Sequence, residues 1–484
     1  MNKMKKILCG VMSALLVAGT AVPMASCGKK GGNVVTGDVD VVAYDGSEQT
    51  ITFYHTMGKN LREVLDTWIP EFNKMYPNIK VKHESLGGYP DLRDQISTEL
   101  TSKRAPSLAF CYADHVALYN NSKAVLTLDD YMVSDLTVER ADGTTETVGY
   151  TDEQLADLVP SYLNEGRVFG DGKTYALPYA KSTEVLYYNK TYFDEKGYEV
   201  PTTWEEMETL CATIKTAEPN NIPLGYDSEA NWFITMAEQK GAPYTSATPG
   251  QKFLFNNEQN WESVEMMKRW YEKGYVTTEE IYTSYTSELF TELDPDKTKT
   301  YMTIGSSAGA SYQTPSVGEG EQKTYGFEVG VAPIPQVDPS NPKAISQGPS
   351  LCIFKKSNNQ EVAAAWLFAK WMTTYVPLQA NYSSQSGYAP VIKSVEQNPV
   401  YAEFLETANG YDNVQASCVK MNIAIKDSTF TSPAFNGSSE ARDEVGLLVV
   451  KILTTPKAQE DVRDFIKKCM KDSIENELEF FFGA

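Results

Sequence analysis

Residues 175–190 read YALPYAKSTEVLYYNK, and this stretch decides the fold class. Residues 175–179 and 185–189 are mostly apolar, have the length of strands and flank a polar turn, so each is predicted to be a strand. A capping box of Thr203 and Glu206 then opens a helix. Strands followed by a helix in this way are typical of α/β lobes.

The same alternation extends from this stretch toward both ends of the chain. Residues 50–54 read as a strand, apolar residues recur at helical spacing over 61–72, and 79–84 read as the next strand. Near the C-terminus a helix is predicted over 442–453. We therefore expect an α/β protein with parallel sheets, whose globular part begins near Thr50 and is long enough for two lobes.

The N-terminus has the layout of a secretory signal. Three of the first six residues are lysines, and they precede an uncharged stretch over 7–26 that leads into the sequence MASCG at 24–28. Glycine, proline and polar residues interrupt this stretch, so its apolar core is too short for a helix that spans a membrane. Small residues before a cysteine resemble the lipobox of bacterial lipoproteins, in which Cys27 would carry lipid and become the new N-terminus.

These features predict how the protein is exported and held. We expect a signal peptide over 1–26 and an extracytoplasmic protein that Cys27 anchors to the bacterial membrane through lipid. The alternative is an ordinary cleaved signal in which Cys27 has no role. Residues 28–49 show neither helical nor strand periodicity, so 27–49 is predicted to be a flexible tether. No later segment is apolar enough to span a membrane.

The composition excludes some classes of partner. The chain carries 43 basic and 64 acidic residues, a formal net charge of −21. Such a surface suits a soluble protein, and it repels the phosphate backbone of nucleic acids. We therefore expect no nucleic-acid partner.

Cysteine and histidine spacing predicts no metal site and no cofactor. The cysteines beyond the lipobox are widely spaced and lack CxxC pairs; they are Cys111, Cys211, Cys352, Cys418 and Cys469. Their odd number and apolar surroundings predict buried thiols, with one disulfide as the alternative. The histidines, His55, His83 and His115, are too far apart for a metal pair on one helix.

One motif resembles a catalytic one. Residues 305–309 read GSSAG, which matches the G-x-S-x-G nucleophile elbow, and they follow a predicted strand over 301–304. A hydrolase of that type needs a histidine downstream of the serine, and no histidine follows His115. We therefore interpret this segment as a binding loop and expect no enzyme. An exported serine hydrolase with Ser307 as nucleophile is the remote alternative.

Three blocks of sequence are similar to the family 1 extracellular solute-binding proteins. They are 175–190 with 201–205, 348–354 with the helix after it, and 386–391. Together with the lipobox they cover the chain almost end to end. The resemblance implies two α/β lobes, joined by crossing hinge segments, that close on a ligand held in the cleft.

The resemblance also implies a function. The chain would be the substrate-binding component of an ABC importer, a monomer that presents a small carbohydrate-like solute to the permease subunits. Lobe one would comprise 50–165 and 348–386, and lobe two would comprise 166–347 and 387–484.

Within that family the chain most resembles the branch that binds glycerol-3-phosphate. The similar segments are 53–57, 87–89, 182–190, 306–307, 348–351 and 387–390. This resemblance implies ligand contacts at Tyr89, Ser182, Ser307, Gly348 and Tyr388. It also makes Arg442 similar to the phosphate-pairing arginine of the branch. A guanidinium suits this role because charge-assisted, bidentate hydrogen bonds are the strong ones.

One position departs from that branch. Where the branch has a glutamate for the glycerol hydroxyls, this chain has Ala113, followed by Asp114. On a loop Asp114 could take over this role, whereas on a strand its carboxylate would point to the other face. Trp232 either stacks on a sugar ring or packs its helix. Arg442 could instead form an ion pair with Glu440, and Asp114 could instead cap the following helix.

The expected ligand is therefore glycerol-3-phosphate or a glycerophosphodiester. The alternative is a neutral mono- or oligosaccharide, since the half of the pocket beside Asp114 departs from the branch.

Overall fold

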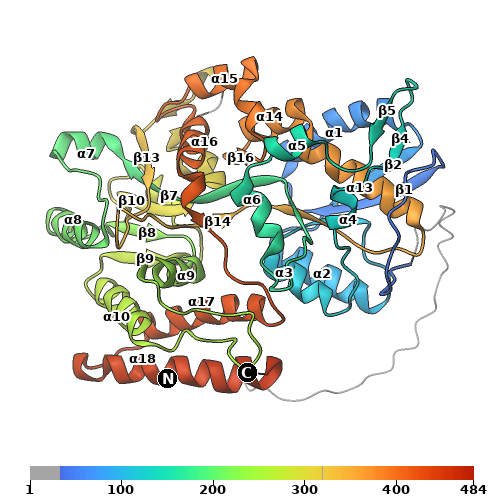
Figure 1. The fold of residues 1–484 in the computed structure, drawn as a ribbon. Helices are drawn as coiled ribbons and strands as arrows, with labels where there is room; N and C mark the ends of the chain where they lie inside the picture. The colour runs from blue at the N-terminus through green and yellow to red at the C-terminus, as the bar shows by residue number, and fades with distance from the viewer. Residues whose placement is uncertain (1–32, 319, 484) are drawn as a thin grey trace, which may run out of the picture. The chain divides into compact units, whose positions relative to one another are not determined.

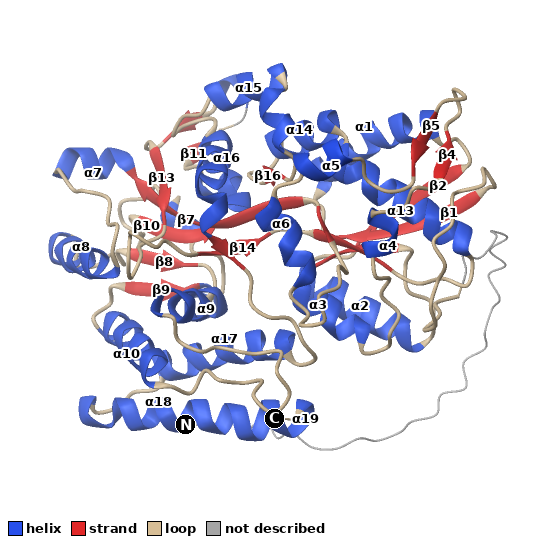
Figure 2. Cartoon of the chain, in the orientation of Figure 1, coloured by secondary structure: helices blue, strands red, loops and turns tan. Residues whose placement is uncertain are grey.

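The computed structural model describes residues 33–318 and 320–483, which form two main sheets with helices packed around them (Figures 1 and 2). The predicted signal peptide over 1–26, the lipidation site Cys27 and residues 28–32 of the predicted tether lie outside the described residues.

The first sheet has the strand order β2–β1–β3–β15–β6. Its strands are β1 (Gln49–His55), β2 (Ile79–Ser85), β3 (Leu108–Cys111), β6 (Leu177–Pro178) and β15 (Ser350–Ile353). Strands β1, β2 and β3 are parallel, whereas β15 runs antiparallel to both β3 and β6. The predicted parallel strand–helix alternation is confirmed here, because α1 (Lys59–Met75) connects β1 to β2 and α2 (Tyr89–Thr101) connects β2 to β3.

The second sheet is built around β7 (Ala180–Asn189). Its other strands are β8 (Leu224–Tyr226), β9 (Val276–Thr278), β10 (Met302–Ser306), β13 (Val329–Pro333), β14 (Ala344–Gln347), β16 (Ala389–Pro390) and β17 (Thr429–Phe430). β8 is parallel to both β10 and β9, while β10, β13, β14 and β16 run antiparallel to β7. This sheet is therefore mixed: its central strand β7 is antiparallel to the strands beside it, whereas β8 is parallel to its two neighbours.

Helices cover both sheets. The longer ones are α3 (Ala113–Asn120), α8 (Trp204–Ala217), α9 (Glu229–Lys240), α10 (Glu258–Glu272), α13 (Asn359–Thr374), α14 (Val376–Ser384), α15 (Pro399–Glu406), α16 (Val414–Ile425), α17 (Ser438–Thr454) and α18 (Val462–Asp472). The shorter elements are α4 (Asp129–Met132), β4 (Thr137–Glu139), β5 (Thr145–Thr147), α5 (Asp152–Asp157), α6 (Pro160–Asn164), α7 (Lys190–Lys196), α11 (Glu279–Tyr282), α12 (Ser287–Phe290), β11 (Ser316–Val317), β12 (Thr324–Tyr325) and α19 (Glu479–Phe482).

The chain crosses between the two sheets at two adjacent places. Tyr179 separates β6 from β7, and Gly348 with Pro349 separates β14 from β15. Gly348 has a φ of +92°, and a Cβ atom there would lie 2.3 Å from the carbonyl oxygen of Ala180. Only glycine fits this close approach. These crossings match the two-lobed fold with hinge segments, while the lobe boundaries at 165/166 and 386/387 stay a prediction.

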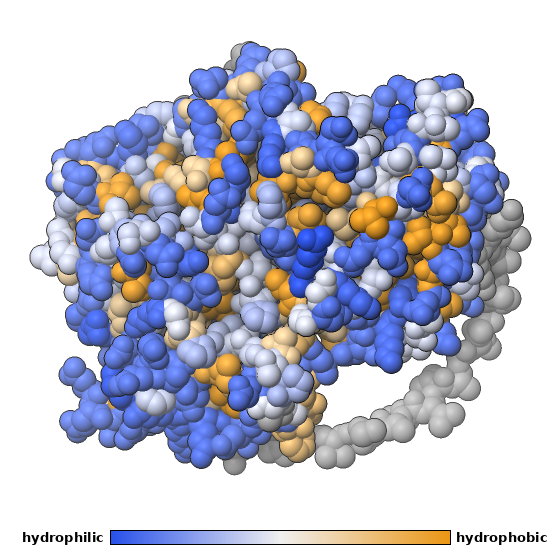
Figure 3. All heavy atoms as spheres, in the orientation of Figure 1, coloured by the Kyte–Doolittle hydropathy of each residue, from blue (hydrophilic) through white to orange (hydrophobic). Residues whose placement is uncertain are grey.

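Each sheet has its own hydrophobic core. Phe53, Phe72, Phe110 and Trp366 are among the buried residues around the first sheet. Trp204, Trp232, Trp270 and Ile304 are among those around the second sheet. Two separate cores are what a two-lobed protein requires, because each lobe then keeps its own packing when the hinge moves. The face drawn in Figure 3 is largely hydrophilic, as the net charge of −21 leads one to expect.

The predicted flexible tether is wrong over residues 33–48. The amides of Val34 and Val35 donate hydrogen bonds to the carbonyl oxygens of Lys103 and Lys355, at 3.1 and 3.2 Å. Val34 is buried, and Gln360 Nε2 donates to the carbonyl oxygen of Ala43 at 3.1 Å. This segment lacks periodicity because distant loops, rather than neighbouring turns of a helix or strand, satisfy its backbone.

Within residues 33–318 and 320–483, no helix could cross a membrane and no cluster of histidine, cysteine and acidic side chains could hold a metal ion. The five predicted buried thiols are confirmed as free and buried.

Buried His55, paired with partly exposed His83, makes the first lobe sensitive to acid. His55 Nδ1 accepts a hydrogen bond from the amide of Met57 at 3.1 Å, and His55 Nε2 lies 2.9 Å from His83 Nδ1. His83 Nε2 in turn lies 2.9 Å from Asp66 Oδ1. Burial, and secondarily the charges of His83 and Arg62, lower the pKa of His55 from 6.5 to about 3.

We expect His55 to destabilise the fold as the pH falls below about 6.5. Below pH 6.5 the unfolded chain binds a proton at His55, whereas the folded chain does not bind it until about pH 3. The contribution of neutral His55 to the free energy of unfolding is therefore fully present above pH 6.5 and decreases as the pH falls toward 3. At one pKa unit per 1.4 kcal/mol, the loss between pH 7 and pH 5 is about 2 kcal/mol. Urea unfolding at the two pH values measures it. His55→Gln should remove that part of the pH dependence, and an unchanged dependence in this variant would contradict the assignment.

Candidate ligand-binding site

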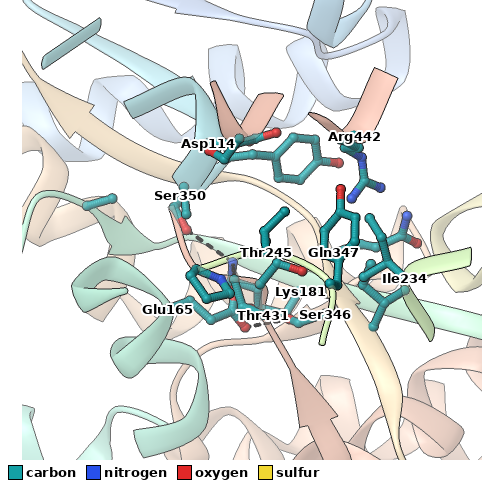
Figure 4. A pocket seen from close by; sticks show the side chains of 18 residues that line it. Asp114, Glu165, Lys181, Ile234, Thr245, Ser346, Gln347, Ser350, Thr431 and Arg442 are labelled. Carbon is teal, nitrogen blue, oxygen red and sulfur yellow. Dashed lines mark hydrogen bonds and ion pairs between the residues drawn. The ribbon is translucent and has the colours of Figure 1, made fainter. Parts of the chain in front are cut away.

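A cavity opens where the two hinge crossings meet the ends of α3 and α17 (Figure 4). Its labelled lining residues are Asp114, Glu165, Lys181, Ile234, Thr245, Ser346, Gln347, Ser350, Thr431 and Arg442. The cavity volume is about 80 Å³. About 10–15 Å³ of such volume holds one water molecule, so the cavity takes a compact ligand of roughly five to eight water volumes.

Arg442 brings a positive charge to this cavity. It lies in the second turn of α17, and its Nη2 donates a hydrogen bond to Asn231 Oδ1 on α9. Within the described part of the chain, no carboxylate forms an ion pair with this guanidinium, so the predicted alternative pairing with Glu440 does not occur. The remaining N–H groups of Arg442 are therefore free to bind an anion.

Asp114 reaches the same cavity. Strand β3 ends at Cys111 and α3 begins at Ala113, so Asp114 lies in the first helical turn rather than on a strand. Ala113 and Asp114 both line the cavity for this reason. Asp114 Oδ1 accepts a hydrogen bond from the amide of His115 at 2.9 Å, whereas the residue at the helix cap is Tyr112. In Figure 4 Asp114 and Arg442 lie on the same side of the cavity.

Several buried polar atoms of the lining have no hydrogen-bond partner within the described residues. They are Tyr244 Oη, Thr245 Oγ1, Gln347 Oε1 and Thr431 Oγ1. Buried polar groups in folded proteins are nearly always paired, and one left unpaired costs about 1–3 kcal/mol. Three hydroxyls and one amide oxygen that converge on one cavity are suited to a ligand with hydroxyl groups.

A buried ion pair closes the opposite side of the cavity. Lys181 Nζ lies 2.7 Å from Glu165 Oε2, 3.0 Å from Ser350 Oγ and 3.4 Å from the carbonyl oxygen of Gly348. The other oxygen of Glu165 accepts a hydrogen bond from Ser346 Oγ. This network joins β7 and β14 of the second sheet to β15 of the first sheet. Sequence reasoning missed it because Lys181 was assigned to a polar turn between two strands.

Aromatic side chains form one wall. Tyr112 lines the cavity, and its ring lies 4.3 Å from that of Tyr89 at an angle of 33°. Burial raises the pKa of Tyr112 to about 12, although the nearby charge of Arg442 opposes this. The proximity of Tyr112 also raises the pKa of Tyr388, after burial. The structure therefore places Tyr89 and Tyr388 around Tyr112 rather than on the cavity lining.

The remaining predicted contacts do not line this cavity. Ser182 is buried and its Oγ accepts a hydrogen bond from Ser306 Oγ at 3.3 Å. Gly348 contributes its carbonyl oxygen to Lys181 and its conformation to the hinge. Trp232 has no exposed surface and packs in the core of the second sheet. Of its two predicted roles, the structure shows packing, because α9 turns this face toward the sheet.

The two lobes also touch beside the cavity. Arg93 Nη1 on α2 lies 3.0 Å from both Asp443 Oδ2 and Ser439 Oγ on α17. Asn121 Nδ2 donates to Asn436 Oδ1 at 2.6 Å. These contacts bring α17, which carries Arg442, against the helices of the first sheet (Figure 1). The cavity is therefore enclosed by both lobes.

Ser307 is not placed as a nucleophile. It has no exposed surface, and its Oγ accepts hydrogen bonds from Asn422 Nδ2 at 2.8 Å and from the amide of Thr183 at 3.4 Å. A serine held in this way fixes α16 to the sheet. It neither lines the cavity nor contacts a described histidine.

We expect Ser307→Ala to lower the free energy of unfolding by about 1–3 kcal/mol, because Asn422 loses a buried acceptor. Ligand affinity should stay within about twofold of that of the wild type, since the side chain does not line the cavity. Urea unfolding and isothermal titration measure the two quantities. Slow hydrolysis of a chromogenic ester that disappears in this variant would contradict the structural role.

Comparison with known proteins supports the same architecture. Residues 67–407 match the family model of the bacterial extracellular solute-binding proteins. The maltotriose-binding protein of Pyrococcus abyssi is 23% identical over 365 residues, which cover 72% of this chain and 68% of that protein. The glycerol-3-phosphate-binding periplasmic protein UgpB of Escherichia coli K12 is 22% identical over 383 residues, or 75% and 79% of the two chains.

Solved structures show the fold. Maltose-bound MalE3 of T. maritima has a TM-score of 0.66 and 19% identity, covering 87% of this chain and 99% of that one. UgpB of Mycobacterium tuberculosis in complex with glycerophosphocholine has a TM-score of 0.68 and 17% identity, covering 89% and 99%. Both neighbours share the two-lobed architecture.

Proposed function

Since this chain belongs to the bacterial extracellular solute-binding proteins, we propose that it captures a small phosphorylated polyol, with glycerol-3-phosphate or a glycerophosphodiester as the first candidate. Proteins of this family bind substrates and are not enzymes, and they work with ABC permease components outside the cytoplasm. The coarser function, an ABC substrate-binding protein for a sugar or glycerophosphate, follows from the family and its relatives.

The observation that carries the proposal is the guanidinium of Arg442. It faces the cavity without a carboxylate partner in the described residues, and the amide of Asn231 holds it. Arg442 is half-buried, and a partly desolvated cation that no protein anion neutralises favours an anionic ligand as its partner. A phosphate accepts the two parallel hydrogen bonds of a guanidinium fork better than a neutral hydroxyl does.

The rest of the ligand would meet hydroxyl and carboxylate groups. The carboxylate of Asp114 can accept hydrogen bonds from a polyol, and Thr245, Thr431 and Tyr244 offer hydroxyls. The cavity volume of about 80 Å³ favours one small unit over an oligosaccharide. A ligand that carries a phosphate and hydroxyl groups, such as glycerol phosphate, would match these lining groups.

A neutral sugar is the second candidate. Tyr112 presents an aromatic face to the cavity, and such faces pack well against sugar rings. The maltotriose-binding protein of Pyrococcus abyssi and maltose-bound MalE3 of T. maritima are among the proteins that this chain is similar to. If the ligand is a neutral sugar, Asp114 and the unpaired hydroxyls of the lining would bind the sugar hydroxyls. Arg442 would then line the pocket without pairing with an anion.

Thermal unfolding with different solutes distinguishes the two candidates. Ligand at a concentration of about 100 Kd stabilises the folded protein by about 2.7 kcal/mol, which is a measurable shift of the unfolding temperature. We expect glycerol-3-phosphate or a glycerophosphodiester to produce the shift, and glycerol and maltose to produce none. A shift with maltose or a monosaccharide alone would overturn the phosphate proposal.

We also propose that the protein is an exported, monomeric lipoprotein, on the strength of the lipobox before Cys27. Cys27→Ala should move the protein from the membrane fraction to the soluble fraction. Retention of this variant in the membrane fraction would contradict a lipid anchor.

A further inference from the structure

Glu184 is a buried acidic residue close to Arg442. Glu184 is the fifth residue of β7, is 1% exposed, and was not singled out from the sequence. Its Oε2 accepts a hydrogen bond from Tyr226 Oη at 2.6 Å. The side chain of Asn231, which is 2% exposed, lies close enough to this carboxyl to lower its pKa by hydrogen bonding. Glu184, Asn231 and Arg442 therefore form a continuous chain from the sheet to the cavity.

The hydrogen bonds set the orientation of Asn231. Its Oδ1 accepts from Arg442 Nη2, so its amide nitrogen is the group that donates to Glu184. The carboxyl of Glu184 thus holds the amide in the orientation that presents an acceptor to the guanidinium. Arg442 in turn lies close enough that its charge lowers the pKa of Glu184.

The groups that face Glu184 from neighbouring elements are few. From β8, Tyr226 donates its hydroxyl, and Asp227, the residue after this strand, adds a negative charge that raises the pKa of Glu184. From α17, Arg442 supplies the positive charge. From β10, the register partner Ser306 carries no titratable group. Burial is the largest effect, and the pKa of Glu184 rises from 4.5 to about 7 as a result.

We propose that Glu184 is a positioning residue that couples capture of an anion at Arg442 to uptake of a proton. This inference rests on the proposed function. An anion bound at Arg442 neutralises the charge that favours the carboxylate of Glu184 and adds a negative charge nearby. Protonation of Glu184 relieves this repulsion, so the bound protein holds the proton more tightly than the free protein.

The direction of the pH effect follows from this difference. The pKa of Glu184 is higher in the ligand-bound protein than in the free protein, so affinity is greatest below the free value of about 7. Affinity declines as the pH rises from the free value to the bound value and is constant above the bound value. A difference of one unit between the two pKa values corresponds to about a tenfold change in Kd.

The binding test uses glycerophosphocholine, because its phosphodiester keeps one negative charge across the range. Titration calorimetry at about pH 6 and about pH 9 should show binding about tenfold tighter at the lower pH, with a proton taken up at intermediate pH. Glu184→Gln keeps the shape of the side chain and should bind with one affinity at both pH values. Glu444→Gln removes a half-buried carboxyl of α17 that accepts a hydrogen bond from Ser473, and this variant should behave as the wild type.

A ligand-free measurement separates this inference from the proposed function. Infrared difference spectra between the wild type and Glu184→Gln report the protonated carboxyl of Glu184 as a function of pH. Arg442→Ala, compared with its double variant with Glu184→Gln, should move the midpoint upward, since Arg442 favours the carboxylate.

The outcomes are distinct. An unmoved midpoint in Arg442→Ala, or a pH dependence of binding that persists in Glu184→Gln, overturns the coupling. If glycerophosphocholine and glycerol-3-phosphate fail to bind while the midpoint still moves, the choice of ligand fails and the link between Glu184 and Arg442 stands.

Discussion

Arg442→Ala is expected to abolish detectable binding of a phosphate ligand. Truncating one partner of a buried, hydrogen-bonded charge pair costs about 2–5 kcal/mol, which corresponds to a loss of affinity of about 30-fold to several thousandfold. The effect should lie at the high end, because no other described cation lines the cavity without a carboxylate partner; Lys181 is paired with Glu165. Titration calorimetry with glycerol-3-phosphate measures the loss.

Two further variants make this result specific. Arg442→Lys keeps a positive charge without the planar fork and should recover part of the affinity. Arg463→Ala removes an arginine that pairs with Glu265 and does not line the cavity, and this variant should bind as the wild type does. If Arg442→Ala keeps its affinity for glycerol-3-phosphate, or loses affinity for a neutral sugar to the same degree, Arg442 is not the phosphate site.

Lys181→Ala is expected to cause the largest loss of stability. Lys181 and Glu165 form an ion pair of 2.7 Å at the hinge, and their side chains are only 2% and 12% exposed. Removing the lysine leaves a buried carboxylate without its cation, which costs about 3–5 kcal/mol. The same change releases the contact that joins β7 to Ser350 of the first sheet. Urea unfolding measures the decrease in the free energy of unfolding.

The matched control removes both charges. The double variant Lys181→Met with Glu165→Gln leaves no unpaired charge, so it should recover most of the stability lost in the single variant. A loss of less than about 1 kcal/mol in Lys181→Ala would mean that the pair behaves like a solvated surface pair. In that case the conformation of Gly348 and the backbone hydrogen bonds of the strands, rather than this ion pair, would hold the hinge in place.

Sequence reasoning found two of the four charged residues that line the cavity. Arg442 was predicted from resemblance and Asp114 from its place beside the position that departs from the resemblance, and both line the cavity. Glu165 and Glu184 were missed because a chain with 64 acidic residues offers no local pattern that marks a buried one, and Lys181 was missed because it was assigned to a polar turn. Burial of a charge depends on what packs over it, and that is a property of the folded chain.

Local periodicity indicated the α/β class, and the resemblance of three sequence blocks indicated the family. Alternating strands and helices are visible in the sequence because each pattern arises from residues a few positions apart. The stretch over 175–190 was correctly predicted to hold strands, but the polar turn predicted between them is wrong, because β7 runs unbroken from Ala180 to Asn189. The missing downstream histidine also argued against a hydrolase site in the serine motif at 305–309.

Only the tertiary structure decided which side chains meet. Arg442 bonds Asn231 across 211 positions of the sequence, and Ser307 is covered by Asn422 across 115. Trp232, Ser182 and Ser307 lie in the interior, while Tyr244 and Thr431 line the cavity. Whether a side chain faces a core or a cavity depends on the distant segment that packs against it, and no local pattern carries that information.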